Sequence, residues 1–271
     1  MDAGGEGEGA SAWPPATLLP LGDAAWTVEF GDVVDPVLQA RVLALAEKVQ
    51  ALRGSATQEA AVLAGVLDVV PTFRSLTVVF DPLRTDADAL GQRLLAWSAA
   101  DAASAHPGRR WQLPVCCAPA FAPDLVDLSA ACGLTDGAVV ALLTSTLFRV
   151  GMIGFMPGFP YMTGLPPALA LPRLASPRRA VPAGSLAVAG ALCCVYPWES
   201  PGGWRLLGHM PLPLFDLAQT SAPAWLAAGD EVRWTAVEAT EHGRLAADWA
   251  RGALGRQDFL DTGEEAPWRT R

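Results

Sequence analysis

The sequence predicts an α+β fold, in which a small α/β sandwich is followed by a closed or partly closed β-barrel. Of the 271 residues, 51% are apolar and 17% are charged, which is enough apolar material for packed cores. Strand-like and helix-like patterns alternate in the first half of the chain. In the second half, glycine and proline separate short apolar runs at close intervals, which is typical of small barrels.

Residues 1–16 are rich in glycine, alanine, glutamate and proline. They contain neither the basic segment nor the apolar core of a secretory signal, so we expect a disordered leader. Further along, the apolar stretches are interrupted by Arg149, Pro157 and Pro160 or end at Pro197. None of them reaches the ~20 uninterrupted apolar residues that a membrane-spanning helix needs, so no membrane partner is expected.

Residues 17–101 are predicted to form the small α/β domain. Pro36 opens a run of apolar residues at helical spacing, which closes near Gly54. Asp86 is a suitable N-cap for a second amphipathic helix. The order strand, helix, strand, strand, helix indicates a split βαβ unit and hence a ferredoxin-like sandwich. The predicted elements are strand 25–30, helix 36–54, strands 62–70 and 73–80, and helix 86–100.

Residues 102–112 contain His106-Pro107-Gly108 and are predicted as a linker. The barrel domain is expected over residues 113–238. It opens with a helical stretch, 124–147, which Gly133 breaks into two helices. Many short strands with frequent turn residues follow. Residues 239–271 are polar and rich in arginine, which predicts a short helix and a frayed tail.

Charge and cysteine content restrict the function classes. The net charge is −9 and no cluster of basic and aromatic residues occurs, so a nucleic-acid partner is not expected. The five cysteines include two adjacent pairs, Cys116-Cys117 and Cys193-Cys194, which is poor geometry for a disulfide framework. Reduced thiols predict a cytoplasmic protein. The three histidines are dispersed, so we expect no metal site, and no covalently bound cofactor is expected either.

An ordered series of motifs runs through residues 154–216. Its Pro-Gly and Gly-Gly turns let the backbone approach a ligand closely and leave N–H groups available as donors. The series reads Gly154-Phe155-Met156-Pro157-Gly158-Phe159-Pro160-Tyr161, Leu171-Pro172-Arg173, Ser176-Pro177-Arg178, Val181-Pro182-Ala183-Gly184-Ser185, Val195-Tyr196-Pro197, Pro201-Gly202-Gly203-Trp204, Leu207-Gly208-His209 and Leu214-Phe215-Asp216.

This series resembles the signature of the family that includes the 5-oxoprolinase B subunit, KipI and allophanate hydrolase subunit 1, which carry a carboxyltransferase domain. The resemblance implies a cyclophilin-like closed β-barrel that pairs with a second barrel subunit, of the type found as the 5-oxoprolinase C subunit or as allophanate hydrolase subunit 2. A third subunit of the LamB/YcsF type is also implied. The implied reaction is the ATP-dependent hydrolysis of 5-oxo-L-proline to L-glutamate, so ATP is the expected co-substrate. The alternatives are urea and allophanate chemistry, or a non-catalytic kinase inhibitor of the KipI kind.

The candidate site residues come from the same segment. Arg173 and Arg178 each follow a proline, which fixes the local backbone and aims a guanidinium that grips carboxylate or phosphate. Ser185 lies in a Pro-Ala-Gly-Ser turn and is a hydrogen-bond donor. These three residues are the catalytic candidates. The substrate- or nucleotide-binding candidates are Gly158, Phe159, Tyr161, Pro182, Ala183, Gly184, Pro201, Gly202, Gly203, Trp204 and His209.

The chain departs from the pattern of the family it resembles at three places. Cys117-Ala118-Pro119 stands where relatives carry Tyr-Gly-Gly, Leu143 and Phe148 replace a His and a Tyr, and Leu192-Cys193-Cys194 replaces Gln-Thr-Gly. Each change removes a polar group. The chemistry then rests on the partner subunit, the substrate differs, or the chain binds without catalysing. His106 and His242 are expected to be solvated.

Overall fold

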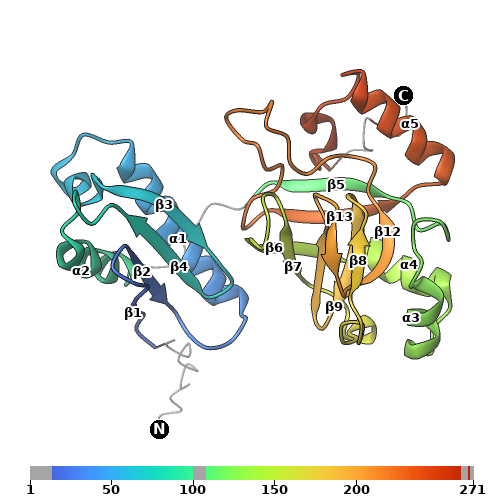
Figure 1. Cartoon of the computed structure of the whole chain (residues 1–271), viewed down its shortest axis with the longest axis horizontal. Helices are drawn as coiled ribbons and strands as arrows, with labels where there is room; N and C mark the ends of the chain where they lie inside the picture. The colour runs from blue at the N-terminus through green and yellow to red at the C-terminus, as the bar shows by residue number, and fades with distance from the viewer. Residues whose placement is uncertain (1–13, 100–107, 264–267, 269–271) are drawn as a thin grey trace, which may run out of the picture. The chain divides into compact units, whose positions relative to one another are not determined.

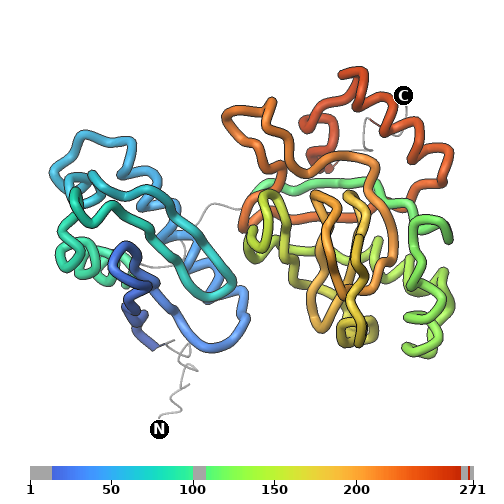
Figure 2. Tube along the Cα trace, in the orientation of Figure 1, coloured from blue at the N-terminus to red at the C-terminus, as the bar shows by residue number. Residues whose placement is uncertain are grey.

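The computed structural model describes residues 14–99, 108–263 and 268. The chain divides into two compact units, Met1–His106 and Pro107–Arg271. Most of the expected leader (residues 1–13) and most of the expected linker (residues 102–107) lie outside the described residues. Figures 1 and 2 show the course of the chain within each unit.

The first unit is a four-stranded antiparallel sheet with two helices packed against it (Figure 1). Its strand order is β1-β2-β4-β3, so β4 lies between β2 and β3, the two strands that α1 connects. This is the split βαβ unit that the sequence predicts. The outer place beside β2 is taken by the N-terminal strand β1. The elements are β1 (Thr17–Pro20), β2 (Ala25–Glu29), α1 (Pro36–Arg53), η1 (Gln58–Leu63), β3 (Val66–Pro71), β4 (Ser75–Phe80) and α2 (Ala87–Ser98).

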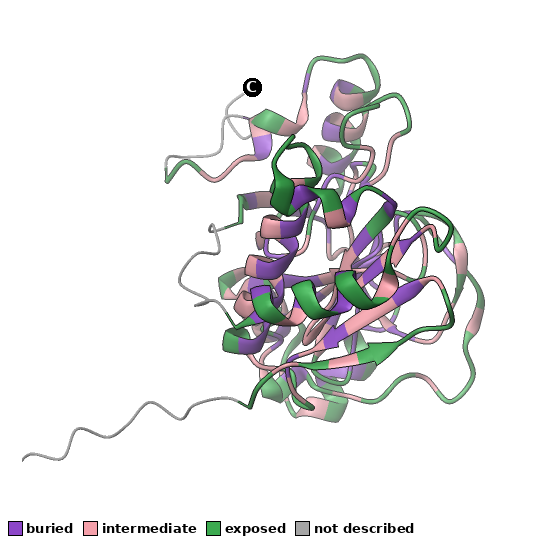
Figure 3. Ribbon diagram, turned by 90° about the vertical axis from the view of Figure 1, so that its left-hand side faces the viewer, coloured by how far each residue is buried: buried purple, intermediate pink, exposed green. Residues whose placement is uncertain are grey.

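Both helices of this unit begin where the sequence predicts, and a side chain caps each start. Asp35 accepts a hydrogen bond from the Val37 amide at 2.7 Å, and Asp86 accepts one from the Ala89 amide at 3.0 Å. Helix α1 ends at Gly54, as expected. The prediction of a strand over residues 62–70 is wrong in its first part, because a 3-10 helix, capped by Thr57, extends to Leu63. Figure 3 shows the buried side of the helices in purple and the exposed side in green.

The second unit is a mixed α/β structure around a curled seven-stranded sheet, with strand order β12-β9-β10-β7-β6-β13-β5. Strands β13 and β5 pair in parallel and the other neighbours pair antiparallel. The two edge strands approach each other at one isolated bridge, Cys116↔His209, where each amide donates to the other carbonyl at 2.9 Å. The sheet strands are β5 (Arg110–Val115), β6 (Leu147–Ile153), β7 (Pro160–Thr163), β9 (Ser185–Ala189), β10 (Leu192–Val195), β12 (Arg205–His209) and β13 (Glu231–Ala236).

The remaining elements of this unit connect and cover the sheet. The predicted break at Gly133 is confirmed: its left-handed φ of 67° ends the first of two helices. A separate two-stranded sheet pairs β8 with β11. These elements are α3 (Leu125–Cys132), α4 (Asp136–Ser145), η3 (Pro167–Leu169), β8 (Arg178–Val181), β11 (Ser200–Gly202), α5 (Ala239–Ala250) and η4 (Arg256–Phe259).

Two expectations about the borders of this unit are wrong. Residues 110–112 belong to strand β5 rather than to a linker, because this strand pairs with β13 along its whole length. The C-terminal segment is not a frayed tail in its described part, since Leu245, Phe259 and Trp268 are buried in the core. The apolar side chains of this late segment complete the core of the second unit.

Strand β9 is buried along its whole length and separates two apolar clusters. Leu186 and Val188 face the main core, whereas Ala187 and Ala189 face a smaller cluster rich in aromatic residues. This unit contains two cavities. The larger lies at one end of β9, and residues of the aromatic cluster line the smaller. Strand β9 thus contributes side chains to both clusters.

Candidate functional site

A cluster of aromatic rings surrounds Phe159, which is buried and lies immediately before β7. Its ring centroid lies 4.9 Å from that of Tyr161, 5.2 Å from that of Tyr196 and 6.4 Å from that of Trp204. Tyr161 and Trp204 are themselves 5.9 Å apart, edge to face. Such contacts stabilise aromatic pairs beyond their apolar burial, so these rings form a well-defined wall.

This wall lines a cavity of about 110 Å³ together with Arg173 and the backbone of Gly202 and Gly203. Arg173 is the only charged residue in the lining, and its guanidinium lies 5.6 Å from the centre of the Trp204 ring. Within the described part of the chain, Arg173 pairs with no carboxylate. A planar guanidinium without a partner binds a carboxylate or phosphate through two parallel hydrogen bonds. The cavity is therefore suited to a small molecule that carries one anionic group.

The tyrosines of the cavity stay protonated at neutral pH. Burial, and to a lesser extent Cys194, raises the pKa of Tyr161, although Arg173 opposes the shift. The pKa of Tyr196 is raised further, also mainly by burial. The hydroxyl of Tyr196 accepts a hydrogen bond from the Trp204 amide, whereas that of Tyr161 has no such partner among the described residues. Tyr161 can thus donate its proton in a hydrogen bond to a ligand.

Gly202 and Gly184 are required by close contacts at the two cavities. A Cβ atom at Gly202 would lie 2.3 Å from the Tyr196 hydroxyl oxygen. At Gly184, where φ is 85°, a Cβ would lie 2.5 Å from the Met210 carbonyl oxygen and 2.7 Å from the His209 ring. A side chain at either position would displace the wall behind it.

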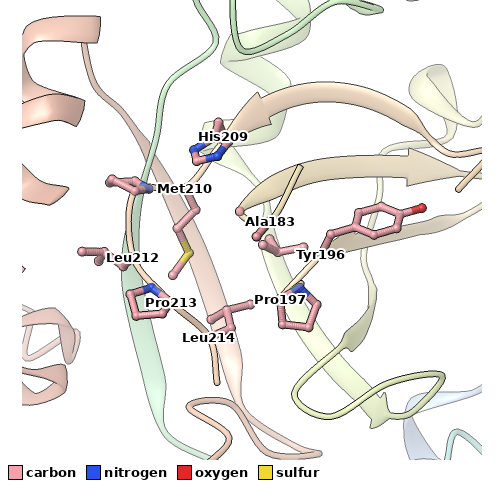
Figure 4. A pocket seen from close by; sticks show the side chains of 11 residues that line it. Ala183, Tyr196, Pro197, His209, Met210, Leu212, Pro213 and Leu214 are labelled. Carbon is pink, nitrogen blue, oxygen red and sulfur yellow. The ribbon is translucent and has the colours of Figure 1, made fainter. Parts of the chain in front are cut away.

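A second cavity, of about 230 Å³, lies at the other side of Tyr196 (Figure 4). Its lining is mostly apolar and includes the run from Met210 to Leu214, and His209 lies at one end. Figure 4 shows the ring of Tyr196 pointing away from Met210 and Leu212. Its ring belongs to the aromatic wall of the first cavity, so this one residue contributes to both.

His209 and His242 form a hydrogen-bonded pair beside this second cavity. Nδ1 of His209 lies 2.9 Å from Nε2 of His242, and the Phe121 ring stacks against both at centroid distances of 5.4 and 4.4 Å. The other nitrogen of His209 donates to the Ala183 carbonyl. In the neutral pair, Nδ1 of His209 must therefore accept from His242. Burial lowers the pKa of His209, and burial together with His209 lowers that of His242.

The expectation that His242 is solvated is therefore wrong. This residue lies on α5, 33 positions beyond His209 in the sequence, and only 9% of it is exposed. No local motif marks the pair. The one available signal is the amphipathic pattern of residues 239–250, which places His242 with Leu245 on the buried side of the helix. His106 lies outside the described residues.

The structure separates the three catalytic candidates. Arg173 lines the small cavity, whereas Arg178 forms an ion pair with the buried Asp124 at 2.5 Å and is only partly exposed. Asp124 also accepts a hydrogen bond from the Leu206 amide at 2.7 Å. Arg178 therefore ties β8 to the start of α3 rather than facing a ligand. Ser185 is 3% exposed at the start of β9, outside the lining of either cavity.

The binding candidates fall into two groups. The small cavity brings together Phe159, Tyr161, Pro201, Gly202, Gly203 and Trp204, and the larger cavity brings together Ala183, Gly184 and His209. Gly158 and Pro182 line neither cavity. Gly158 has a φ of 77° and packs against Phe215. The sequence does not single out Tyr196 as a site residue.

All five cysteines are free, and no pair of them faces across the cavities. Cys193 and Cys194 are neighbours on β10, so they point to opposite faces of the sheet and join different apolar clusters. Burial raises the pKa of Cys117 to about 12 and that of Cys194 well above its ordinary value. Among the described residues, no group of three or more potential metal ligands is arranged to hold an ion.

No single helix in the described ranges is long and apolar enough to cross a membrane. Helices α3 and α4 reach the necessary length and composition only together, and they are bent by 93° where they meet. Val139 and Leu143 of α4 are buried in the core of the second unit.

Residues 16–226 match the family model described as carboxyltransferase domain, subdomain C and D. The 5-oxoprolinase B subunit of Escherichia coli O157:H7 is 36% identical over 79% of this chain and 93% of its own length. The protein of the same name from Bacillus subtilis (strain 168) is 32% identical over 82% of this chain and 93% of its own length.

Solved structures resemble the chain as well. TTHA0988 superposes with a TM-score of 0.67 and 36% identity over 79% of this chain, which spans 40% of that longer polypeptide. The urea amidolyase of K. lactis superposes with a TM-score of 0.70 over 94% of this chain and 16% of its own length. At 20% identity, the second likeness concerns the fold alone. In both cases the fold of this chain recurs as part of a longer polypeptide.

Proposed function

The chain belongs to the carboxyltransferase domain family, subdomain C and D, and from this premise we propose that it is the B-type subunit of an ATP-dependent 5-oxoprolinase. The proposed reaction hydrolyses 5-oxo-L-proline to L-glutamate. Water adds to the lactam carbonyl carbon, the C–N bond breaks, and the ring nitrogen leaves as the amine of glutamate. ATP hydrolysis drives the opening of this unstrained amide.

The observation that carries the proposal is the unpaired Arg173 in a small aromatic cavity. 5-Oxoproline is one five-membered ring with one carboxylate. The guanidinium binds the carboxylate, and the apolar faces of Tyr161 and Trp204 contact the ring methylenes. The protonated Tyr161 hydroxyl is available to the lactam carbonyl oxygen, where negative charge develops when water adds.

The lining of the small cavity contains no histidine and no carboxylate that could act as a general base. The two cavities, at about 110 and 230 Å³, are also smaller than the roughly 300–1,000 Å³ of sites that enclose drug-sized ligands. We therefore assign the base and most of the ATP site to partner subunits. This chain then supplies recognition of the substrate and stabilisation of developing charge.

The proposed partners are a second barrel subunit of the C type and a third subunit of the LamB/YcsF type. The curated relatives are named as B subunits, which implies a multi-subunit enzyme for them. TTHA0988 is a single polypeptide of which this chain spans 40%. The rest of that polypeptide is long enough to contain a partner domain fused to the part that matches this chain. We propose that the corresponding partner of this chain is a separate subunit, and that the complex works in the cytoplasm, where five free thiols persist.

The proposal extends to the named folds. The split βαβ topology supports a ferredoxin-like first unit in which β1 replaces the usual last strand. The Cys116↔His209 bridge between the edge strands supports a cyclophilin-like barrel for the second. The urea and allophanate alternative is supported by fold alone. Apolar ring walls favour a substrate with methylene groups, which urea and allophanate lack. No observation favours a kinase-inhibiting role.

The test is ATP turnover by the complex reconstituted from this chain and its partner subunits, with 5-oxoproline or allophanate as substrate. We expect turnover that depends on 5-oxoproline and is lost in Arg173→Ala. Arg179→Ala is the matched control, because Arg179 is an exposed arginine that lines neither cavity. Turnover with allophanate but not with 5-oxoproline would assign the chain to the urea branch. If Arg173→Ala and Arg179→Ala lose the same amount of 5-oxoproline-dependent turnover, the effect of Arg173 is not specific to the cavity.

A further inference from the structure

Phe155, which lines the small cavity, has an unusual backbone. Its φ is 67°, and it is the only residue other than glycine with a positive φ in the described part of the chain. The Met156 amide donates to the Gly154 carbonyl at 2.8 Å, so Phe155 is the central residue of a γ-turn with positive φ. This turn is rare and strained for a residue that has a Cβ atom. A glycine would adopt it without strain.

The loop around this turn is closed by further backbone hydrogen bonds. The Gly154 amide donates to the Phe159 carbonyl and the Phe159 amide donates to the Met156 carbonyl, both at 3.1 Å. Gly158, with its φ of 77°, packs against Phe215 on the other side. The loop therefore fixes the backbone of Phe155 and holds the strained conformation in place.

The ring of Phe155 contributes little to the core. The residue is 68% exposed, while Phe159 and Trp204 in the same lining are nearly fully buried. It makes an edge-to-face contact with Phe159, with a centroid distance of 5.5 Å. Backbone strain and an exposed aromatic ring both cost stability. The residue therefore gains little packing in return for its strained backbone.

We propose that Phe155 is a specificity-determining residue that covers the small cavity and contacts the ring of a bound cyclic, singly anionic substrate. The inference rests on the proposed function, because it takes the ligand of Arg173 to be such a molecule. Arg173 holds the carboxylate, while Phe155 lines the same cavity with an exposed ring. The fixed γ-turn orients the ring in advance, so little conformational entropy is lost when the substrate binds.

The test compares Phe155→Gly and Phe155→Tyr in the assembled complex. Phe155→Gly removes the ring and the strain together, so we expect a melting temperature at or above that of the wild type. Its KM for 5-oxoproline should rise about tenfold while kcat changes little, which corresponds to the loss of one aromatic contact. Phe155→Tyr keeps the ring and should restore the wild-type KM.

Specificity provides a readout that a structural role would not change. Phe155→Gly should lower the preference, in kcat/KM, for 5-oxoproline over the six-membered lactam 6-oxopiperidine-2-carboxylate. An unchanged KM and an unchanged preference in Phe155→Gly overturn the inference. Failure of this variant to bind the partner subunits, seen by size-exclusion chromatography, also overturns it and assigns the ring to the subunit interface.

The two proposals fail in different ways. If the wild-type complex shows no 5-oxoproline-dependent turnover, the proposed function is wrong and the inference falls with it. If wild type, Arg173→Ala and Arg179→Ala behave as expected while Phe155→Gly resembles wild type, the inference alone is wrong.

Discussion

In the proposed site, Arg173 would recognise a small ligand through charge and Tyr161 through a hydrogen bond. The guanidinium supplies the charge of the cavity lining, and burial keeps the Tyr161 hydroxyl protonated. An unpaired cation beside aromatic rings attracts an anion and repels a second cation, so the cavity is not an aromatic cage for ammonium groups. Cys117 and Leu143 stand where relatives carry polar residues. Neither of them lines this cavity, so these two replacements do not change its lining.

The His209–His242 pair makes stability depend on pH. The pKa values of both histidines are lowered in the folded state. At a pH between these lowered values and the ordinary value near 6.5, the unfolded chain therefore binds more protons than the folded chain. The free energy of unfolding should therefore be highest above pH 6.5 and fall as the pH is lowered through and below 6.5. His242→Gln should reduce this slope between pH 7.5 and 5.5.

Urea denaturation at several pH values measures this slope. The same slope in wild type and in His242→Gln would contradict a buried neutral pair. Sequence patterns identify His209, through its motif, but not its partner. The hydrogen bond joins the end of β12 to a helix that follows a different part of the sheet, and only the folded chain brings the two rings together.

The start of helix α3 shows how elements are joined by a buried carboxylate. Asp124 pairs with Arg178 of β8 and accepts from the Leu206 amide of β12, so three elements meet at one side chain. Arg178→Ala leaves this carboxylate without its ion partner. We expect a loss of about 2–4 kcal/mol in the free energy of unfolding, below the largest known values because the guanidinium is still partly solvated.

Chemical denaturation measures this loss, and the double variant Asp124→Asn/Arg178→Ala should recover part of it. Turnover of the folded complex should remain near the wild-type level in Arg178→Ala. If turnover is abolished while stability is unchanged, Arg178 is a ligand-contacting residue, as its sequence motif first suggests.

Helices are more predictable from this sequence than sheet partners. Pro36, Asp86 and Gly133 are local signals, and the helices begin or end where these residues predict. The 3-10 helix before β3 is not predictable in this way, because its apolar residues also fit a strand. Strand β1 gives no signal either, since Thr17–Pro20 is too short to show alternation.

At the scale of the molecule, sequence distance hides the main contacts. Strands β5 and β13 pair in parallel although 121 residues separate Arg110 from its partner Glu231. No local pattern specifies such a pairing. The polar composition of residues 239–271 likewise predicts a tail, although this segment supplies core residues. The candidate site is partly predictable, because most of its lining comes from motifs within residues 154–216.

The central claim is that Arg173 binds the carboxylate of 5-oxoproline in the small cavity. Calorimetric titration of 5-oxoproline into the assembled complex, without turnover, tests it most directly. We predict saturable binding in wild type and in Arg179→Ala, and a loss of at least about tenfold in affinity in Arg173→Ala, which is typical of a missing charge-assisted hydrogen bond. Equal affinity in Arg173→Ala and wild type would contradict the account.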